Sequence, residues 1–434
     1  MEYQTQDSAY LKKCQSELRE RYQRFKAEKL KLDMSRGKPC PEQLDLSQGL
    51  ITCLKEDDYR TKDGVDCRNY GGIEGIPEAR ELLAPILEAD PNNVIVNGNS
   101  SLAIMYDVIV RALLVGVPGG SGPWSKLPEV KFLCPSPGYD RHFAICNQLG
   151  IEMITIELNA NGPDMDQVER LAAEDESIKG IWCVPKYSNP SGVTYSDEVV
   201  DRFAKMKTKA SDFRIFWDNA YAVHHLTDQP DQLKNILNAC RKAGNPDRVL
   251  LFSSTSKISF AGAGLSLMAG SENNINWLKK QIGIQTIGPD KLNQLRHVRF
   301  FKNFSGIEEQ MKKHASIIKP KFEQVLKTFE AELGGKGVAE WTKPNGGYFI
   351  SLNTLEGCAK KVVAMAAEAG VILTGAGATY PYGNDPLDRN IRIAPTYPTL
   401  TELKKAMEIV AVCVQLASIE KILGGRQYSV NVKS

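Results

Sequence analysis

Short apolar runs alternate with helical stretches along much of this chain. The runs are VIV from residue 94, VKFLC from 130, GIWCV from 180, FRIFW from 213 and VLLF from 249. Helical patterns cover 75–88, 101–115 and 197–208 between and around them. Short β-rich runs that alternate with helices are typical of an α/β domain with a largely parallel sheet. The alternation therefore predicts one large α/β domain.

The pattern changes near residue 300. The long helical stretch SGIEEQMKKHASIIKPKFEQVLKTFEAEL contains Pro320, where a kink or break is expected because proline lacks a backbone N–H. It is followed by GGYFISL, a helix near 357–369, VILTGAG, NIRIAP and a last helix from 399. This order predicts a smaller α+β unit. Residues 8–31 predict an amphipathic helix, which either packs with this unit or binds another protein.

The length of the chain fits more than one compact unit. Its 434 residues are too many for one small core. We expect an N-terminal helix and extended segment at 1–52 that packs with the small domain. A large domain should cover 53–310, and a small C-terminal domain should cover 311–434.

Composition excludes several classes of protein. The 54 basic and 52 acidic residues give a net charge of +2, which indicates neither a nucleic-acid nor a membrane partner. Ten cysteines lack the spacing of a metal site, and no apolar stretch is long enough to span a bilayer. Because no secretory signal stands at residues 1–4, we expect reduced cysteines and a cytoplasmic protein.

Polar residues follow each apolar run. In open α/β sheets, ligands bind beyond the carboxyl ends of the strands, so these residues are candidates for a site. They are NGNSS at 97–101, PSPGY at 135–139, PKYSNPSG at 185–192, DNAY at 218–221 and SSTSK at 253–257. One edge of the sheet would then collect hydroxyls, amides, an aspartate, tyrosines and a lysine.

Each of these segments also has an ordinary interpretation. The residues before the helix at 101 fit a helix N-cap, and NPSG at 189–192 fits a turn. Asp218 could cap a helix, and a single lysine such as Lys257 is usually exposed to solvent. The chemical interpretation therefore depends on the segments taken together.

Together the residues match the needs of pyridoxal 5′-phosphate (PLP). Lys257 can form an imine with an aldehyde, and Asp218 can keep a pyridine nitrogen protonated. Asn189 and Tyr221 offer donors for the ring oxygen, and Tyr139 offers an aromatic face for stacking. A helix N-terminus with hydroxyl groups suits the phosphate.

The same segments resemble the fold-type-I PLP-dependent aminotransferases over nearly the whole chain. The matching pieces are GGIEGIPEAREL from Gly71, NGNSSLA, PSPGYDRH, SNPSGVTYS, DNAY, SSTSK, PNGGYF and NIRIAPTYP. SRGKP, CPSPGYDRHF and TSKISFAGAG more narrowly resemble the bacterial aspartate aminotransferase subgroup related to MocR-type aminotransferase domains. The resemblance implies a large domain with a mainly parallel seven-stranded sheet between helices, plus a smaller α+β domain.

The resemblance also implies roles for residues around the ring of the cofactor. Lys257 would be the Schiff-base lysine and the proton shuttle, and Asp218 would pair with the pyridinium nitrogen. Tyr221 and Asn189 would hydrogen-bond the ring oxygen, and Tyr139 would stack on the ring.

At the phosphate, the resemblance implies ligands from two segments and from a second subunit. They are Ser100, Ser101 and Ser254, with Tyr70 from the partner of a homodimer, and Asn99 and Ser256 are further cofactor-binding candidates. The chain departs from the family eight residues after the lysine, where Leu265 replaces a common phosphate-binding arginine. Ser259 or a distant basic residue could compensate for this charge.

For the substrate, the resemblance implies that Arg392 binds the α-carboxylate, together with Asn189, while Gly37 lets the backbone approach. A dicarboxylate needs a second cation, for which Arg36, Lys38 and Arg141 are candidates. Arg141 is the first choice because it follows Tyr139 by two residues, although it could also be an ordinary surface arginine. We expect aspartate and glutamate as donors, and 2-oxoglutarate or oxaloacetate as acceptors.

Other functions stay open from the sequence. The chain could transaminate kynurenine, 2-aminoadipate or an aromatic amino acid, or it could be a PLP-dependent lyase. A non-catalytic MocR-like regulator would need an N-terminal DNA-binding domain. The segment before Tyr70 has room for little beyond one helix and an extended stretch, which disfavours that reading.

Overall fold

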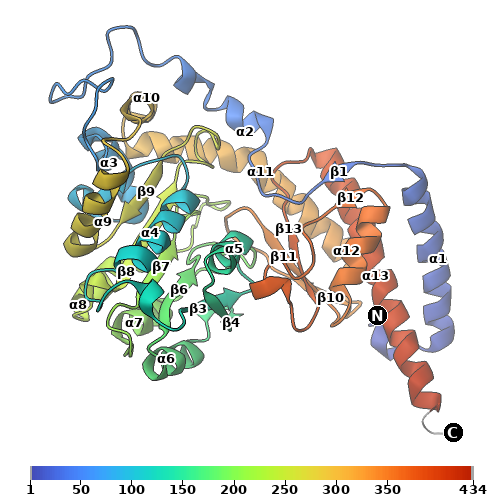
Figure 1. Ribbon diagram of the computed structural model, residues 1–434. Helices are drawn as coiled ribbons and strands as arrows, with labels where there is room; N and C mark the ends of the chain where they lie inside the picture. The colour runs from blue at the N-terminus through green and yellow to red at the C-terminus, as the bar shows by residue number, and fades with distance from the viewer. Residues whose placement is uncertain (1, 432–434) are drawn as a thin grey trace.

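The computed structural model describes residues 2–431, and a large mixed sheet forms its centre (Figure 1). The strand order is β2-β9-β8-β7-β6-β3-β4-β5. The bounds are β2 Val94–Val96, β3 Lys131–Ser136, β4 Glu152–Asn159, β5 Gly162–Pro163, β6 Ile178–Cys183, β7 Arg214–Asp218, β8 Val249–Ser254 and β9 Ser266–Ala269. All five apolar runs of the sequence are strands of this sheet, as predicted.

The sheet is parallel from β4 through β3, β6 and β7 to β8. β9 is antiparallel to both β8 and β2, so β2 again runs in the direction of β8. The two-residue strand β5 pairs antiparallel with β4 and adds an eighth strand to the seven expected. Consequently β2, β8, β7, β6 and β3 all end at the same edge.

Helices cover both faces of the sheet, as Figure 1 shows. The helices of this part of the chain are α3 Pro77–Leu83, α4 Ser101–Val115, α5 Asp140–Gln148, α6 Met165–Glu174, α7 Asp197–Lys205, α8 Ile236–Lys242, α9 Glu272–Gln285 and α10 Lys291–Phe301. One core joins the sheet to residues of α3, α6, α7, α8 and α10, and the other joins it to residues of α4, α5 and α9. The sheet is thus buried on both sides, as parallel sheets usually are.

The central strands supply alternate side chains to these two cores. Ile215 and Trp217 of β7 belong to the first core, whereas Phe216 belongs to the second. Because successive side chains of a strand point to opposite faces, a strand buried on both faces reads as a continuous apolar run. This explains why GIWCV, FRIFW and VLLF carry so few polar residues.

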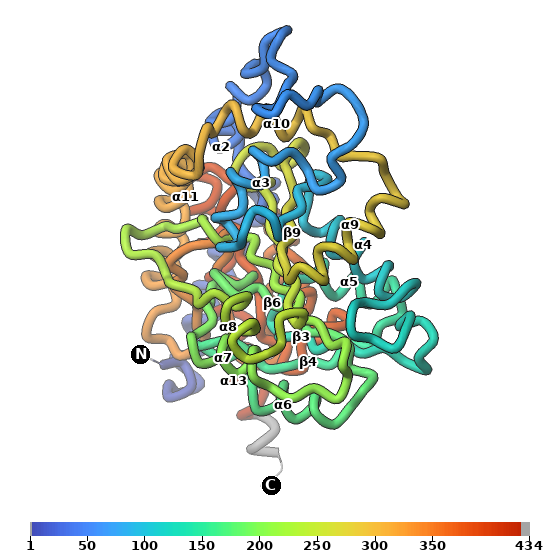
Figure 2. The backbone as a smooth tube through the Cα atoms, turned by 90° about the vertical axis from the view of Figure 1, so that its left-hand side faces the viewer, coloured from blue at the N-terminus to red at the C-terminus, as the bar shows by residue number. Residues whose placement is uncertain are grey.

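A smaller α+β unit lies beside the large sheet (Figure 1) and behind it in the view of Figure 2. Its strands are β10 Ala339–Trp341, β11 Ile350–Thr354 and β13 Asn390–Ile393, which pair antiparallel in that order. A separate parallel pair joins β1 Leu32–Asp33 to β12 Val371–Ile372. The remaining helices are α1 Ser8–Ala27, α2 Pro41–Asp45, α11 Phe304–Leu333, α12 Ala359–Glu368 and α13 Leu400–Asn431.

The N-terminal helix α1 packs with this unit. Its buried residues Leu11, Leu18, Tyr22 and Phe25 share one core with residues of α11, α12 and α13. Arg21 also donates two hydrogen bonds of 2.7 Å to the carboxylate of Glu332 in α11. The face of α1 that the sequence predicted as amphipathic is therefore buried within the same chain.

Pro320 lies inside α11 and does not end this helix, which runs unbroken for 30 residues. The buried residues Ile318, Phe322 and Val325 surround the proline and hold the helix in the small core. Packing thus offsets the hydrogen bond that proline removes. The predicted domain boundary between 310 and 311 falls inside this continuous helix. The division into 53–310 and 311–434 stays a prediction.

Three further properties follow from the described residues. All ten cysteines are free. No helix within residues 2–431 is long and apolar enough to cross a membrane. In the same range, no three His, Cys, Asp or Glu side chains form a group that could hold a metal ion.

Candidate active site

Lys257 and Asp218 meet at the carboxyl edge of the sheet. Asp218 is the last residue of β7 and lies opposite Phe252 of the neighbouring parallel strand β8. Lys257 lies three residues beyond the end of β8, and its Nζ lies 5.2 Å from the ring centre of Tyr221 and 5.7 Å from that of Tyr348. The structure thus brings Lys257, Asp218 and Tyr221 together, as the sequence predicted.

The surroundings of Lys257 change its protonation. Burial lowers the pKa of its ammonium group, and the negative charge of Asp218 opposes this shift without cancelling it. A lysine with a lowered pKa offers a free amine more readily near neutral pH. Burying a charged lysine costs free energy. The same burial favours the neutral amine, which is the reactive form.

One carboxylate oxygen of Asp218 contacts a histidine, and the other has no hydrogen-bond partner within residues 2–431. Its Oδ2 lies 3.0 Å from Nε2 of the buried His142, whose ring stacks on Trp182 at 4.2 Å. Its Oδ1 is buried and has no hydrogen-bond partner within residues 2–431. Buried polar atoms are rarely left unpaired. This oxygen fits the protonated ring nitrogen of PLP.

Two tyrosine hydroxyls near Asp218 stay protonated. Burial raises the pKa of Tyr139 to about 12, and it raises the pKa of Tyr221 well above its ordinary value. Both phenols can therefore donate hydrogen bonds at neutral pH. The ring of Tyr139 meets His142 edge-on at 4.9 Å, so the predicted stacking residue lies beside the Asp218 pair.

Arg392 reaches this site from β13 of the smaller unit. One of its terminal nitrogens, Nη1, lies 2.7 Å from Oδ1 of Asp140 and 3.4 Å from Oδ1 of Asn189. The other, Nη2, lies 3.3 Å from Oγ1 of Thr374. The guanidinium also lies 5.0 Å from the ring centre of Phe349. Arg392 and Asn189 are therefore neighbours in the structure.

Gly37 packs directly against the aromatic ring under Arg392. A Cβ built on Gly37 would lie 2.4 Å from Cζ of Phe349. The neighbouring residue Ser35 accepts a hydrogen bond of 2.7 Å from Thr374, which also contacts Arg392. Gly37 thus makes room for Phe349, and the segment around it forms one side of the arginine site.

The predicted phosphate residues and the cofactor candidates Asn99 and Ser256 lie in two adjoining segments. Ser100 caps α4, with its Oγ accepting a 3.3 Å hydrogen bond from the N–H of Ala103, and Ser101 begins the helix. Ser256 donates a 3.2 Å hydrogen bond to the carbonyl of Asn99 and receives one of 3.1 Å from Ser254. Hydroxyls thus gather at a helix N-terminus, a position that favours anions.

The position of the missing arginine belongs to the core. Leu265 is buried, and its N–H donates a 2.8 Å hydrogen bond to Oγ1 of Thr255. Ser259 is also fully buried, and its hydroxyl contacts Thr255 and lies 2.9 Å from Nε2 of His297. Because Ser259 faces this interior network, it does not replace the absent charge.

The candidate cations for a second carboxylate lie around Arg392. Arg36 is exposed in the segment beside Gly37, and Arg141 is exposed in the first turn of α5 beside Asp140. Lys38 follows Gly37 and is also exposed, with Nζ 3.8 Å from the ring centre of Tyr397. All three cations are exposed, and Arg36 and Arg141 carry the planar guanidinium groups that suit a carboxylate.

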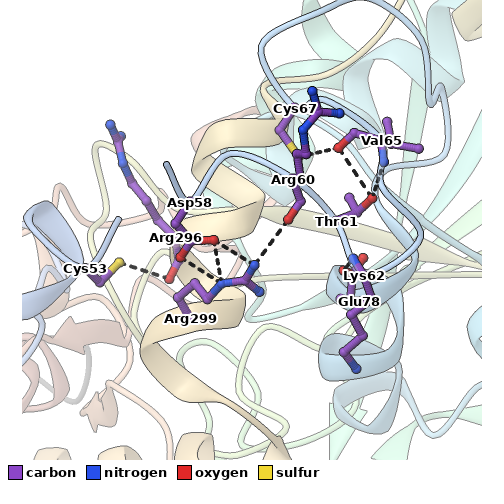
Figure 3. Close-up of polar contacts among 10 residues, drawn as sticks. All are labelled: Cys53, Asp58, Arg60, Thr61, Lys62, Val65, Cys67, Glu78, Arg296 and Arg299. Carbon is purple, nitrogen blue, oxygen red and sulfur yellow. Dashed lines mark hydrogen bonds and ion pairs between the residues drawn. The ribbon is translucent and has the colours of Figure 1, made fainter. Parts of the chain in front are cut away.

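Tyr70 projects from a well-anchored segment. Its side chain is 77% exposed, although the neighbouring carbonyls of Asn69 and Gly71 each accept a hydrogen bond from Lys291. The preceding stretch is fastened to α10, where Arg299 binds both carboxylate oxygens of Asp58 (Figure 3). The loop is thus held in place on both sides of Tyr70, whose side chain faces solvent.

Four contacts of the site were missed from the sequence. His142, Asp140, Phe349 and Thr374 each touch a predicted residue, but they were not singled out. His142 lies three residues after Tyr139, so both stand on one side of the start of a helix. This spacing could have identified His142 from the sequence. The other three depend on contacts between distant segments and had no such signal.

The fold and this site define a fold-type-I transferase. The solved aspartate transaminase of Corynebacterium glutamicum superimposes with a TM-score of 0.95 at 44% identity, covering 97% of this chain and 99% of that one. A protein of Mycolicibacterium smegmatis named as an aminotransferase is 50% identical, over 95% of this chain and 97% of its own length. An aspartate aminotransferase of Corynebacterium glutamicum is 46% identical, over 93% of each.

The family model for aspartate amino-transferases matches residues 6–426. The chain therefore belongs to the aspartate aminotransferase family, and it is an aminotransferase.

The packing of Gly37 on Phe349 leads to a first prediction. Gly37→Ala places a methyl group inside the Phe349 ring, so we expect a loss of about 1–3 kcal/mol in the free energy of unfolding. Urea denaturation measures this change. Gly375→Ala is the matched control, because a Cβ there meets nothing within 4 Å. Equal stability of the two variants would contradict the prediction.

Proposed function

We propose that this protein transfers the amino group of aspartate or glutamate to 2-oxoglutarate or oxaloacetate, with PLP as its cofactor. The observation that carries the proposal is the unpaired, buried Oδ1 of Asp218 beside a lysine of lowered pKa. The names of the two Corynebacterium glutamicum proteins support the choice of aspartate.

The residues at the sheet edge would hold the cofactor by complementary groups. Asp218 would accept the ring N–H, while His142 holds the second oxygen of its carboxylate. Tyr221 and Asn189 would donate to the ring oxygen, and Tyr139 would cover one face of the ring. Asn99, Ser100, Ser101, Ser254 and Ser256 would bind the phosphate.

When bound, PLP withdraws electrons and so makes the Cα proton of an amino acid easier to remove. The amine of Lys257 would remove this proton and deliver it on the other side of the transferred nitrogen. Its lowered pKa suits this task, because a proton carrier works best when its pKa lies near the working pH. Lys257 would thus act as both acid and base.

Arg392 would orient both substrates by their α-carboxylates. A planar guanidinium can bind a carboxylate through two parallel hydrogen bonds, which fixes the position of Cα relative to Lys257. Because donor and acceptor would use this one arginine, they would occupy the site in turn. This arrangement implies a ping-pong order, in which the first product leaves before the acceptor enters.

The side-chain carboxylate of the substrate would bind an exposed cation. Arg141 is our first choice because it stands next to Asp140, which touches Arg392. Arg36 lies beside Gly37 on the opposite segment and is the second choice. A second arginine would favour dicarboxylates over alanine, since a charge-assisted contact is worth more than a neutral one.

Lys257→Ala tests the proposed reaction. Removing the amine should abolish steady-state formation of oxaloacetate from aspartate and 2-oxoglutarate, whereas the wild type should be active. Lys186→Ala is the matched control, because burial also lowers the pKa of Lys186 but this residue has no role in the proposed chemistry. Turnover near that of the wild type in purified Lys257→Ala would refute the assignment.

Arg141→Ala tests the choice of substrate. We expect kcat/KM for aspartate to fall about 10- to 100-fold, the usual worth of one charge-assisted hydrogen bond, while kcat/KM for alanine stays nearly constant. The same pair of measurements on Arg36→Ala compares the second candidate. If Arg141→Ala lowers aspartate turnover no more than alanine turnover, Arg141 does not bind the side chain.

Tyr70 tests the proposed homodimer through hybrid complementation. If Tyr70 serves the site of the partner, a mixed dimer of Tyr70→Ala and Lys257→Ala chains contains one intact site. Unfolding and refolding the two inactive variants together should then restore activity that neither has alone. No restoration would mean that Tyr70 acts within its own chain, and light scattering of the wild type would check the dimer itself.

A further inference from the structure

Arg392 is already engaged by a carboxylate of this chain. Its Nη1 lies 2.7 Å from Oδ1 of Asp140, the shortest of its contacts with Asp140, Asn189 and Thr374. The pair is charged on both sides and therefore stronger than the neutral contacts. A substrate carboxylate that binds Arg392 therefore has to displace Asp140 or share the guanidinium with it.

The two members of the ion pair differ in exposure. The side chain of Arg392 is 6% exposed, whereas that of Asp140 is 30% exposed. The Nε of Arg392 is buried and has no hydrogen-bond partner among the described residues. A ligand arriving from solvent thus meets the guanidinium on its Asp140 side, because the Nε side is closed.

The backbone around Asp140 is held by helix and loop hydrogen bonds, while its side chain is partly exposed to solvent. Asp140 is the first residue of α5, and the nearby N–H of Gly138 donates a 2.7 Å hydrogen bond to Thr379. Asp140 can therefore leave Arg392 only by a rotation of its own side chain. Such a change is small, and it exposes Nη1 to an incoming carboxylate.

We propose that Asp140 is an affinity-determining residue that competes with substrate carboxylates for Arg392. The proposal rests on the proposed role of Arg392 as the α-carboxylate site. When a substrate binds, one ion pair replaces another, so the net gain is smaller than an unpaired arginine would give. Asp140 thereby weakens the binding of every carboxylate ligand.

This competition acts equally on both halves of the reaction. Donor, acceptor and both products carry an α-carboxylate, so each would displace Asp140 on entry, and Asp140 would return on release. In a ping-pong enzyme the site must empty between the two half-reactions. A built-in competitor helps it to empty, at the cost of a higher KM for each substrate.

Asp140→Asn tests the proposal in the cofactor-loaded protein, with succinate as a non-reactive dicarboxylate probe. The amide can still accept a hydrogen bond, but it is neutral and competes less. We expect the Kd of succinate, measured by calorimetry, to fall about tenfold, the effect of one charge-assisted hydrogen bond. The KM for aspartate should fall with it, while kcat does not rise.

Three variants separate competition from a change in folding. Asp140→Glu should keep the Kd of the wild type, because it retains the charge. In an Arg392→Gln background, Asp140→Asn should give no gain, because the shared partner is gone. Asp166→Asn is the matched control, since Asp166 also lies in the first turn of its helix and pairs with Arg202 at 2.6 Å. This control should leave the Kd unchanged.

The outcomes distinguish this inference from the proposed function. If the wild type turns over aspartate and binds succinate, but Asp140→Asn binds succinate no more tightly, competition by Asp140 is wrong and the proposed function stands. If Arg392→Gln binds succinate as tightly as the wild type, the carboxylate role of Arg392 is wrong, and both proposals fall. Tighter binding that persists in the Arg392→Gln background would also overturn the competition.

Discussion

Parallel pairing of β6, β7 and β8 is the constraint from which the site follows. In parallel strands the carboxyl ends lie at one edge, and here that edge holds Asn189, Asp218 and Lys257 after three successive strands. The strands are buried on both faces, and the polar residues of the candidate site lie where each strand leaves the sheet. The reactive groups therefore meet at the border between an apolar core and the rest of the site.

The sequence predicted the elements that carry a strong period. All five apolar runs are strands, and the helix expected at 101–115 is α4, Ser101–Val115. The strand β4, Glu152–Asn159, was not singled out, because polar residues interrupt it and it has no continuous apolar run. β9 was also missed, since it has only four residues and runs against its neighbours.

The residues of the candidate site also divide into those that the sequence predicted and those that it did not. Lys257, Asp218, Tyr221 and Asn189 stand in short segments whose order along the chain can be read directly, and the structure brings them together. The pairing of Arg392 with Asp140 could not be read, because 252 positions separate the two residues and only the packing of two units joins them. The contact between the ring of Phe349 and Gly37 could not be predicted either, because no local sequence pattern indicates it.

The beginning of the chain is part of the proposed substrate site, although it lies far from the sheet edge in sequence. α1 is buried against the helices of the smaller unit, and β1 pairs with β12. The next residues then contact Thr374 and Phe349, which both touch Arg392. Residues 2–40 thus connect the packing of the smaller unit to the surroundings of Arg392. A substitution in α1 that weakens this packing could alter substrate recognition without touching a single residue of the site.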